Sequence, residues 1–295
     1  MVRMPELPEV ETTVRELKKK VLGRTFIDVW TDFKKIIKKP TDFEKFKKEI
    51  KGRKIEKIRR RGKNILIDLS GGRTLLIHQK LTGHLLLGKW RRKKGEWIAV
   101  TPGPLKEDPM NRFLHLVLWL DNGQMLSLSD LRKFAKVELW ESEELEKSKE
   151  IKELGPEPLE KSFTFNKFKE ILKNKKGKIK QVLMDQSVIA GIGNIYSDEI
   201  LWEAKIHPFK DVSKLTEVEL KRIHQAMQNI LKKAIAVKGE SISDFRRISG
   251  QKGGFDPLRK VYRREGKKCP RCGAIIKRAK IGGRSAHFCP KCQKL

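Results

Sequence analysis

The chain has 295 residues, a length that allows two domains and a small appendage and that is enough to bury a sizeable core. Its 68 Lys and Arg residues exceed its 37 Asp and Glu residues, so the formal net charge is +31. Such a surplus favours nucleic acid or an anionic membrane surface as the partner and argues against an enzyme of small neutral metabolites.

The distribution of apolar residues gives two further exclusions. Val, Ile, Leu and Phe are spread along the whole chain, which argues against wholesale disorder. No run approaches the ~18–20 apolar residues of a membrane-spanning helix, and the first residues lack the apolar stretch of a signal peptide. We therefore expect a cytoplasmic protein.

The first predicted element is an amphipathic helix. Val10, Val14, Leu17 and Val21 recur at helical spacing and form one apolar stripe, which Gly23 ends. Short β-rich runs then follow as far as residue 140, and their close spacing predicts a β-sandwich or barrel against which the helix packs. The predicted strands are residues 26–30, 64–69, 74–78, 84–87, 97–100, 113–120, 124–128 and 136–140.

A change of composition divides the chain after these strands. Residues 141–153 are rich in Glu and Lys and run into Gly155-Pro156, which is typical of a hinge between domains. Helical periodicity follows, so the sequence predicts an α+β chain. The predicted segments are a sandwich domain at 1–140, a hinge at 141–155, a helical domain at 156–245 with helices near 165–172, 179–184, 195–202 and 215–235, and a final segment at 246–295.

All four cysteines lie in the last 27 residues, as two pairs with a two-residue gap within each pair. In a reducing compartment, this spacing is typical of tetrahedral ligands of a structural zinc ion, because each tight turn aims both sulfurs at one ion. Two disulfides or four free thiols are the alternatives. The predicted ligands are Cys269, Cys272, Cys289 and Cys292.

Two other segments have residues that can do chemistry. Pro5, Glu6 and Glu9 are ordinary helix-start residues, but removal of the methionine before Pro5 also exposes an α-amine. An α-amine has a pKa of about 7.7–8.0, so much more of it is nucleophilic at neutral pH than of a lysine. Gly191-Ile192-Gly193 lacks the third glycine of a dinucleotide fold, so its backbone amides, with Asn194 at the helix cap, suit a DNA phosphate better.

Five motifs in chain order resemble the formamidopyrimidine-DNA glycosylase family, from residue 4 to the C-terminus. The resemblance implies a β-sandwich with flanking helices, a helix-two-turns-helix domain and a zinc finger that holds one structural zinc ion. It also implies removal of oxidised purines from duplex DNA, with the damaged nucleotide flipped out of the stack, followed by cleavage at the abasic site. The motifs are residues 4–12 (MPELPEVET), 154–159 (LGPEPL), 183–186 (LMDQ), 191–196 (GIGNIY) and the four-cysteine finger.

The resemblance also implies the catalytic residues. Pro5 corresponds to the nucleophile that attacks C1′ of the deoxyribose, and the resulting Schiff base leads to β,δ-elimination. Glu6 corresponds to the general acid and base at the sugar ring oxygen, and Glu9 supports it. Lys63 matches a catalytic lysine at the tip of a β-hairpin, where it contacts phosphate and assists proton transfer.

The same resemblance implies two sets of DNA contacts. Lys180, Asn194 and Arg284 correspond to phosphate ligands beside the lesion, and Arg284 lies in the zinc-finger loop. The space left by the flipped base is filled by three side chains, which here are Leu81, Arg132 and Phe134. Leu81 stands in place of a methionine, and Leu131 in place of a proline, which could loosen the second loop. Without the resemblance, Leu81 and Phe134 are more readily explained as core residues than as DNA contacts.

Two regions leave questions open. A chain that keeps residues 1–4 has Pro5 in a peptide bond with no amine, so we expect the active form to begin at Met4 before methionine removal. Residues 239–254, with Arg246, Arg247 and Lys252, correspond to the loop that closes over the extruded base, but they do not rank 8-oxoguanine against formamidopyrimidines.

Rival functions remain at this point. An endonuclease VIII type with oxidised pyrimidine substrates shares the fold, although its start usually departs from Glu-Leu-Pro-Glu. A catalytically silent DNA-binding protein keeps the clamp and the finger, and a ribosomal or RNA-binding zinc protein explains only the charge and the cysteines. We expect a bacterial, nucleoid-associated monomer that binds double-stranded DNA with strongly salt-dependent affinity and no membrane.

Overall fold

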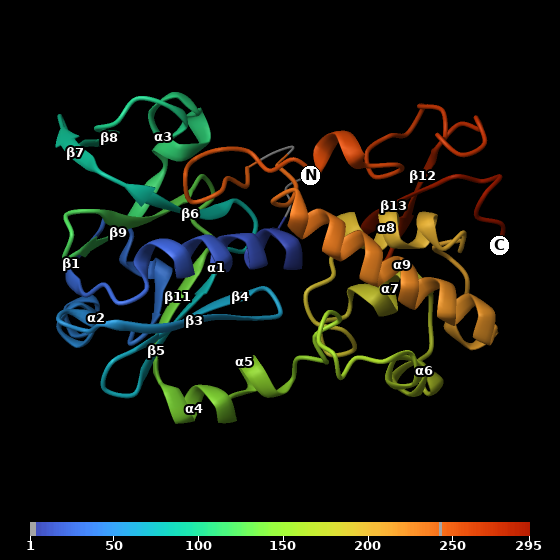
Figure 1. The fold of residues 1–295 in the computed structure, drawn as a ribbon, viewed down its shortest axis with the longest axis horizontal. Helices are drawn as coiled ribbons and strands as arrows, with labels where there is room; N and C mark the ends of the chain where they lie inside the picture. The colour runs from blue at the N-terminus through green and yellow to red at the C-terminus, as the bar shows by residue number, and fades with distance from the viewer. Residues whose placement is uncertain (1–3, 242–243) are drawn as a thin grey trace. The chain divides into compact units, whose positions relative to one another are not determined.

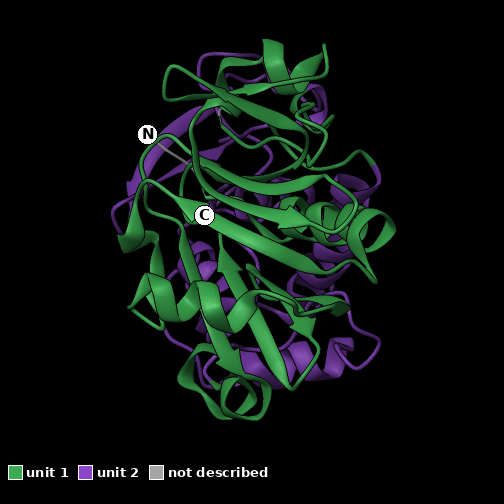
Figure 2. Cartoon of the chain, turned by 90° about the vertical axis from the view of Figure 1, so that its left-hand side faces the viewer, with its two compact units in different colours: residues 1–152, 237–256 green, residues 153–236, 257–295 purple. Residues whose placement is uncertain are grey.

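The computed structural model describes residues 4–241 and 244–295 and divides into two compact units (Figure 2). The first unit comprises residues 1–152 and 237–256, and the second comprises residues 153–236 and 257–295. No described helix is long and apolar enough to cross a membrane. Met1, Val2 and Arg3, on which the question of the active start depends, lie outside the described residues.

Two sheets and one long helix build the first unit (Figure 1). The predicted sandwich is confirmed, because side chains of both sheets and of α1 (Leu7–Val21) share one apolar cluster. Within it lie Val10 and Leu17 of the helix, Leu116 of one sheet and Ile77 of the other. One sheet has the order β1 (Phe26–Thr31), β9 (Leu114–Leu120), β10 (Met125–Asp130) and β6 (Gly83–Gly88); the other has β2 (Ile37–Lys39), β11 (Lys136–Glu141), β5 (Arg73–His78), β4 (Asn64–Leu69) and β3 (Ile55–Arg61).

Local signals account for the helices of this unit. The stripe of valines and Leu17 lies on the buried face of α1, and Gly23 follows the helix with a φ of 79°, a conformation that glycine adopts without strain. Asp42 caps α2 (Phe43–Ile50) by accepting a hydrogen bond from the backbone N–H of Lys45 at 2.6 Å. Smaller elements are η1 (Lys34–Ile36), β7 (Trp90–Lys93), β8 (Glu96–Ala99), α3 (Pro104–Glu107) and η2 (Pro109–Arg112).

The segment predicted as a hinge is largely helical. It forms α4 (Ser142–Lys147) and α5 (Lys149–Lys152), and Leu145 of α4 is fully buried against the sheet residues Leu66 and Leu76. The two units meet in the chain after residue 152, near the end of the predicted hinge. A few well-spaced apolar residues in a charged stretch are thus sufficient for two short packed helices.

The second unit is mostly helical, as predicted. Its longest helix, α9 (Glu217–Ala236), buries Ile223, Met227 and Leu231 at helical spacing. A two-stranded hairpin with the four cysteines completes the unit. The remaining elements are α6 (Phe165–Lys173), α7 (Ile179–Met184), α8 (Asn194–Glu203), η3 (Val212–Lys214), β12 (Lys277–Ile281) and β13 (Arg284–Phe288); η4 (Asp256–Leu258) straddles the boundary of the units.

The chain returns to the first unit after α9. Leu87 donates its backbone N–H to the carbonyl of Ile248 at 2.8 Å, and Arg247 forms an ion pair with Glu16 of α1 at 2.5 Å. Residues 237–256 therefore group with the sandwich, whereas the predicted boundaries divided them between the helical domain and the final segment. Sequence periodicity could not reveal this return, because it depends on contacts more than 100 residues apart.

Candidate functional site: two groups of predicted DNA-processing residues

The start of α1 holds Pro5, Glu6 and Glu9 in a compact arrangement. Pro5 is buried, and the side chains of Glu6 and Glu9 are only 3% and 2% exposed. Glu6 and Glu9 form a reciprocal capping box, in which Oε2 of Glu9 accepts the backbone N–H of Glu6 at 2.8 Å. The capping geometry therefore orders the backbone next to Pro5 and fixes two carboxylates beside it.

Glu9 also joins this helix start to the segment that returns from α9. Its other oxygen, Oε1, accepts the backbone N–H of Glu240 at 2.8 Å. Gly239 precedes this contact with a φ of 78°, and a Cβ on it would lie 2.8 Å from Glu9 Oε1. Only glycine fits here, so the close approach of residues 239–240 to Glu9 is built into the sequence.

Lys63 lies in the two-residue turn between β3 and β4, as predicted for a hairpin tip. Gly62 has a φ of 57°, which such a turn requires. Arg60 at the end of β3 donates to Gly62 O at 2.9 Å and to the Glu11 side chain of α1 at 3.0 Å, so the turn is tied to the helix. Burial opposes ionisation of Glu11, but hydrogen bonds from Arg15 and Arg60 lower its pKa.

Leu81 and the pair Arg132 and Phe134 lie on two turns that share one buried carboxylate. Asp130 is fully buried, and its oxygens accept the hydroxyl of Thr82 and the backbone N–H of Ala135, the latter at 2.7 Å. The Thr82 hydroxyl oxygen in turn accepts the backbone N–H of Arg132 at 3.1 Å. The two turns are thus cross-linked by hydrogen bonds through Asp130 and Thr82.

The exposure of these side chains shows whether they belong to the core or are available for DNA contact. Phe134 is 48% exposed, so it is not a core residue, and the guanidinium of Arg132 lies 4.6 Å from the centre of its ring. Leu81 is half-buried. An exposed aromatic ring with an arginine above it is available for contact with a ligand, as predicted for side chains that enter a base stack.

In the second unit, Asn194 and the zinc-finger hairpin meet. Asn194 is the first residue of α8, and Gly193, rather than Asn194, occupies the cap position. Its Nδ2 donates to the hydroxyl of Ser285 at 3.3 Å, while its buried Oδ1 has no hydrogen-bond partner in the described part of the chain. Arg284 precedes Ser285 and is exposed at the start of β13, directly after the glycine turn.

Lys180 differs from its predicted role as a phosphate ligand. Its side chain is fully buried, and Nζ lies 2.5 Å from the Asp198 carboxylate, which is fully buried too. The same ammonium donates to the hydroxyl of Ser197 at 3.2 Å and to the carbonyl of Asn194 at 3.4 Å. A direct phosphate contact needs an exposed cation, so this geometry does not support the predicted contact and instead has Lys180 fix the first turn of α8.

Asp198 extends this network to the finger. Its second oxygen accepts both the backbone N–H and Nδ1–H of His287 in β13, each at 2.9 Å. One buried carboxylate therefore connects α7, α8 and the hairpin that bears Arg284. Sequence reasoning missed Asp198, Asp130 and Thr82; all three lie in or beside motifs that were recognised, but each has a partner 18 to 89 residues away.

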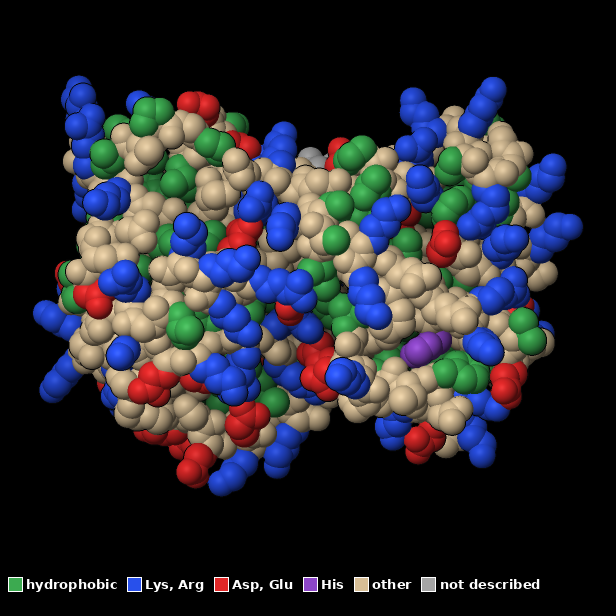
Figure 3. All heavy atoms as spheres, viewed as in Figure 1, with side chains coloured by type: hydrophobic (Ala, Val, Ile, Leu, Met, Phe, Trp, Pro, Cys, Tyr) green, Lys and Arg blue, Asp and Glu red, His purple; other side chains and the backbone are tan. Residues whose placement is uncertain are grey.

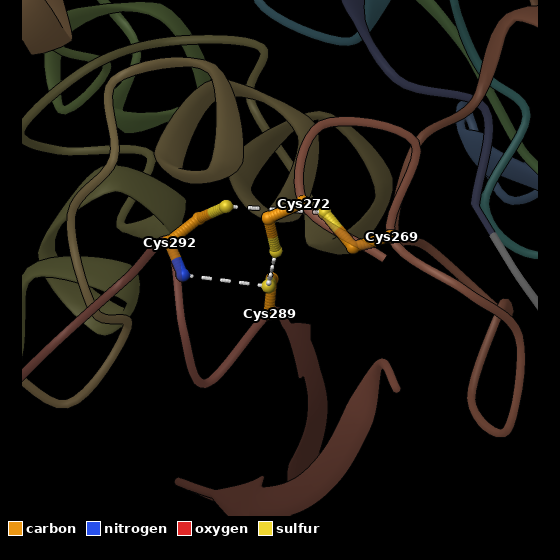
Figure 4. Close-up of side chains that lie close together, drawn as sticks. All are labelled: Cys269, Cys272, Cys289 and Cys292. Atoms are coloured by element: carbon orange, nitrogen blue, oxygen red, sulfur yellow. Dashed lines mark hydrogen bonds between the residues drawn. The ribbon is translucent and has the colours of Figure 1, made fainter. Parts of the chain in front are cut away.

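The four cysteines point toward a common centre (Figure 4). Their sulfur atoms all lie within 4.8 Å of one another, with Cys272 and Cys289 at 3.4 Å and Cys269 and Cys292 at 4.0 Å. Tetrahedral Zn–S bonds of about 2.3 Å place sulfurs about 3.8 Å apart, so this set fits one zinc ion. Burial opposes ionisation of Cys269, but the Trp202 indole N–H and backbone N–H groups lower its pKa to about 6, whereas burial and the neighbouring cysteines raise the pKa of Cys292 to about 12.

Comparison with known proteins gives the same order of parts. The formamidopyrimidine-DNA glycosylase N-terminal domain matches residues 4–137, the H2TH domain of that enzyme matches 154–246, and a zinc finger found in FPG and IleRS matches 266–295. A formamidopyrimidine-DNA glycosylase from Pelotomaculum thermopropionicum is 40% identical over 99% of this chain and 100% of its own length. The chain belongs to the formamidopyrimidine-DNA glycosylase family.

Further relatives in this family agree. The formamidopyrimidine-DNA glycosylase of Streptococcus thermophilus is 38% identical over 99% of this chain and 100% of its own length. Two structures of Lactococcus lactis Fpg, in complex with DNA containing an abasic site or Fapy-dG, are 35% identical with TM-scores of 0.85 and 0.84. Each of these two structure matches covers 98% of this chain and 100% of the relative. The cysteine cluster is the zinc finger of this family and holds one structural zinc ion.

Proposed function

We propose that this formamidopyrimidine-DNA glycosylase family member is a bifunctional DNA glycosylase and abasic-site lyase of base excision repair. Its substrates are oxidised purines, 8-oxoguanine and formamidopyrimidines, in duplex DNA. The observation that carries the proposal is the α1 start, where a proline that can become N-terminal adjoins two ordered, buried carboxylates. Relatives solved with DNA that contains Fapy-dG or carbocyclic 8-oxo-G support the substrate class.

Pro5 is the proposed nucleophile. When residue 5 begins the chain, its secondary amine attacks C1′ of the flipped nucleotide, the N-glycosidic bond breaks and the base leaves with a proton. Glu6 protonates the sugar ring oxygen as the ring opens, and the lone pair of the Pro5 nitrogen completes an iminium bond to C1′. Glu9 orients Glu6 by accepting its backbone N–H in the capping box.

The iminium then drives strand cleavage. It acidifies C2′–H, so loss of that proton breaks the C3′–O bond and releases one phosphate, and a second elimination releases the other phosphate from C5′. Lys63 is proposed to contact phosphate and assist proton transfer from the hairpin tip that Arg60 ties to α1. The zinc ion orders the finger and takes no part in bond breaking.

The DNA contacts are proposed in two groups. Asn194 and Arg284 bind phosphates, and the unpaired Oδ1 and exposed guanidinium leave both side chains room to reorient. Lys180 acts through Asn194 as a positioning residue. Leu81, Arg132 and Phe134 fill the space of the flipped base, which accounts for the exposure of Phe134.

Several predictions of context accompany this function. We propose a monomer in which residues 239–254 close over the extruded base. Residues 242 and 243 of that loop lie outside the described residues. The cytoplasmic, nucleoid-associated location remains a prediction. Size-exclusion chromatography with light scattering, with and without a lesion duplex, tests the monomer.

Borohydride trapping tests the nucleophile. Two forms of the chain, beginning at Met1 and at Met4, react with duplex DNA that has 8-oxoguanine opposite cytosine, and intact mass reports methionine loss. We expect a covalent adduct only from the Met4 form after methionine removal. An adduct from the unprocessed Met1 form would transfer the role to a lysine, with Lys63 first. Tight binding without any adduct would favour a catalytically silent DNA-binding protein.

Oxidised pyrimidines are the second candidate substrate class. One Lactococcus lactis Fpg structure contains DNA with an oxidised pyrimidine, so the family fold accepts such a base. The Glu6-Leu7-Pro8-Glu9 start favours purine lesions. Single-turnover rates on matched duplexes decide between the two: we expect faster excision of 8-oxoguanine and formamidopyrimidine, and the reverse order would indicate an endonuclease VIII-like enzyme.

A further inference from the structure

The β7–β8 hairpin of the first unit carries a dense group of cations. Lys89, Arg91, Arg92, Lys93 and Lys94 are exposed, and none has an ion pair in the described part of the chain. Figure 3 shows Lys and Arg side chains gathered at the upper left, over this hairpin. Glu96, which lies opposite Lys93 in the register, is the one acid of the hairpin, so five cations outweigh it and the hairpin is electrostatically suited to a polyanion.

The two faces of this hairpin differ. Arg91 and Lys93 share one face, while Trp90 and Arg92 lie on the other, where the register pairs Arg92 with Trp97 of β8. The Arg92 guanidinium lies 5.1 Å from the centre of the Trp30 ring. Trp30 and Trp97 are in edge-to-face contact at 5.2 Å, so the second face combines cations with aromatic rings.

A cavity of about 580 Å³ opens beside these rings. Trp30, Trp90, Trp97 and Phe113 line it, together with Asp32 and other polar residues. The indole Nε1–H of Trp97 is buried and has no hydrogen-bond partner among the described residues. Because this N–H has almost no accessible surface, an occupant of the cavity meets the tryptophan rings rather than the indole donor.

The cavity adjoins the turn that carries the side chains proposed to fill the base stack. Phe113, on the cavity wall, accepts a backbone hydrogen bond from Asp130 at 2.9 Å through its carbonyl. Asp130 directly precedes the turn with Arg132 and Phe134, and it fixes that turn. One backbone hydrogen bond thus joins the cavity wall to the residue that precedes this turn.

We propose that the β7–β8 hairpin and its tryptophan cavity bind single-stranded DNA that flanks the lesion duplex. Arg91 and Lys93 contact phosphates, and the cavity takes an unpaired base, which stacks on the tryptophan rings. Cations interleaved with aromatic rings are the usual composition of single-strand binding surfaces. A paired base stays inside the duplex stack and cannot enter the cavity, so the structure favours a single strand over continuous duplex. The inference rests on the proposed function only in taking DNA as the substrate.

Fluorescence anisotropy tests this surface. The two ligands are a blunt duplex with one 8-oxoguanine and the same duplex with a ten-nucleotide thymidine tail. We expect the tail to tighten binding by about tenfold, since stacking of one base is worth about 1–3 kcal/mol. In the R91Q/K93Q variant, the gain disappears and the slope of log affinity against log salt falls by about 1.4 for the tailed ligand. In the W97F variant, the preference for the tailed duplex should fall several-fold, while the slope of log affinity against log salt stays unchanged.

A matched control removes two exposed cations from the end of α1, as K18Q/K19Q. We expect this control to keep the tail preference, and all variants to cleave the blunt duplex at the wild-type rate. Equal binding of blunt and tailed DNA by wild type, or the same loss in the control as in R91Q/K93Q, overturns the inference. Failure of wild type to excise 8-oxoguanine, with tail binding intact, overturns the proposed function instead.

Discussion

The two units hold their proposed DNA-processing residues by different physical means. In the first unit, the carboxylates of Glu9 and Asp130 accept backbone N–H groups and so fix turns without any buried cation. In the second, a fully buried Lys180–Asp198 pair and a four-cysteine metal site order the ligand-bearing elements. The turns at Glu9 and Asp130 therefore depend on neutral backbone donors, whereas the second unit depends on charges that cannot be removed one at a time.

This difference predicts at which residues a substitution lowers the stability of the protein most. A carboxylate that caps a turn costs about 1.5–3 kcal/mol when lost, whereas half of a buried ion pair costs about 3–5 kcal/mol because its partner stays charged and desolvated. In the first unit, a substitution should therefore be able to abolish catalysis without loss of stability. In the second unit, a substitution in the buried pair should lower DNA affinity and stability together.

The largest effect is expected at Glu6. Glu6→Gln keeps the capping-box geometry but removes the proton donor, so single-turnover excision of 8-oxoguanine should fall by about 10²–10⁴ with DNA affinity unchanged. Glu44→Gln, an exposed change in the first turn of α2, is the control and should have no effect. A Glu6→Gln rate within threefold of wild type would remove Glu6 from the mechanism and weaken the separation of catalysis from stability.

The buried pair should give the next largest effect. Asp198→Leu leaves the Lys180 ammonium without a partner, so the free energy of unfolding should fall by about 3–5 kcal/mol in urea titrations. The double variant K180M/D198L removes both charges and should recover about 2 kcal/mol of that loss. DNA affinity should follow the same order, since Asn194 and the hairpin next to Arg284 depend on the network. Strictly additive effects of the two changes would contradict a coupled pair.

A smaller loss is expected at Asp130. Asp130→Ala removes the acceptor for Thr82 and for the turn amides, so the free energy of unfolding should fall by about 2–3 kcal/mol. Asp121→Ala is the matched control, because Asp121 also caps a turn of the same unit but is exposed, and about 1 kcal/mol or less is expected there. Equal losses at both sites would show that burial of the carboxylate does not matter.

The last expected effect is the smallest at neutral pH and grows only on acidification: it is a dependence of stability on pH in the first unit. Burial lowers the pKa of His84 to about 4, below its ordinary value of 6.5. The unfolded chain therefore binds a proton that the folded chain does not, so stability should fall by about 1.4 kcal/mol per pH unit as pH drops from 6.5 to 4 and stay level above 6.5. His84→Asn should reduce this slope in urea titrations at several pH values. An unchanged slope would assign it to other groups, such as His78, whose pKa burial lowers to about 3.

The sequence predicted most of the elements that have a clear apolar period. The strand at residues 64–69 matches β4, and the helix stripe of Val10 and Leu17 lies on the buried face of α1. β3 was missed because its IEKIRRR sequence has few apolar residues, as an edge strand permits. Strand β7 was missed for the same reason, since only Trp90 of its four residues is buried.

In the candidate site too, the sequence predicted the features that depend on neighbours in the chain and missed those that depend on distant residues. Local motifs located Pro5, Glu6 and the cysteines, because capping boxes and two-residue gaps depend on neighbours in the chain. Lys180 could not be assigned correctly, since a lysine on the surface and one paired with a buried carboxylate have the same sequence signature. The difference lies in Asp198, 18 residues away and on another helix.

By itself, the sequence determined the order of the parts, the zinc ligands and the residue types at the proposed active site, because each follows from spacing within a few residues or from ordered motifs. Only the tertiary structure decided which charges are buried, which turns share Asp130, where residues 237–256 pack and which tryptophans line a cavity. Those features depend on the solvent exposure of each group and on partners distant in the chain, and both are set when the sheets and helices pack.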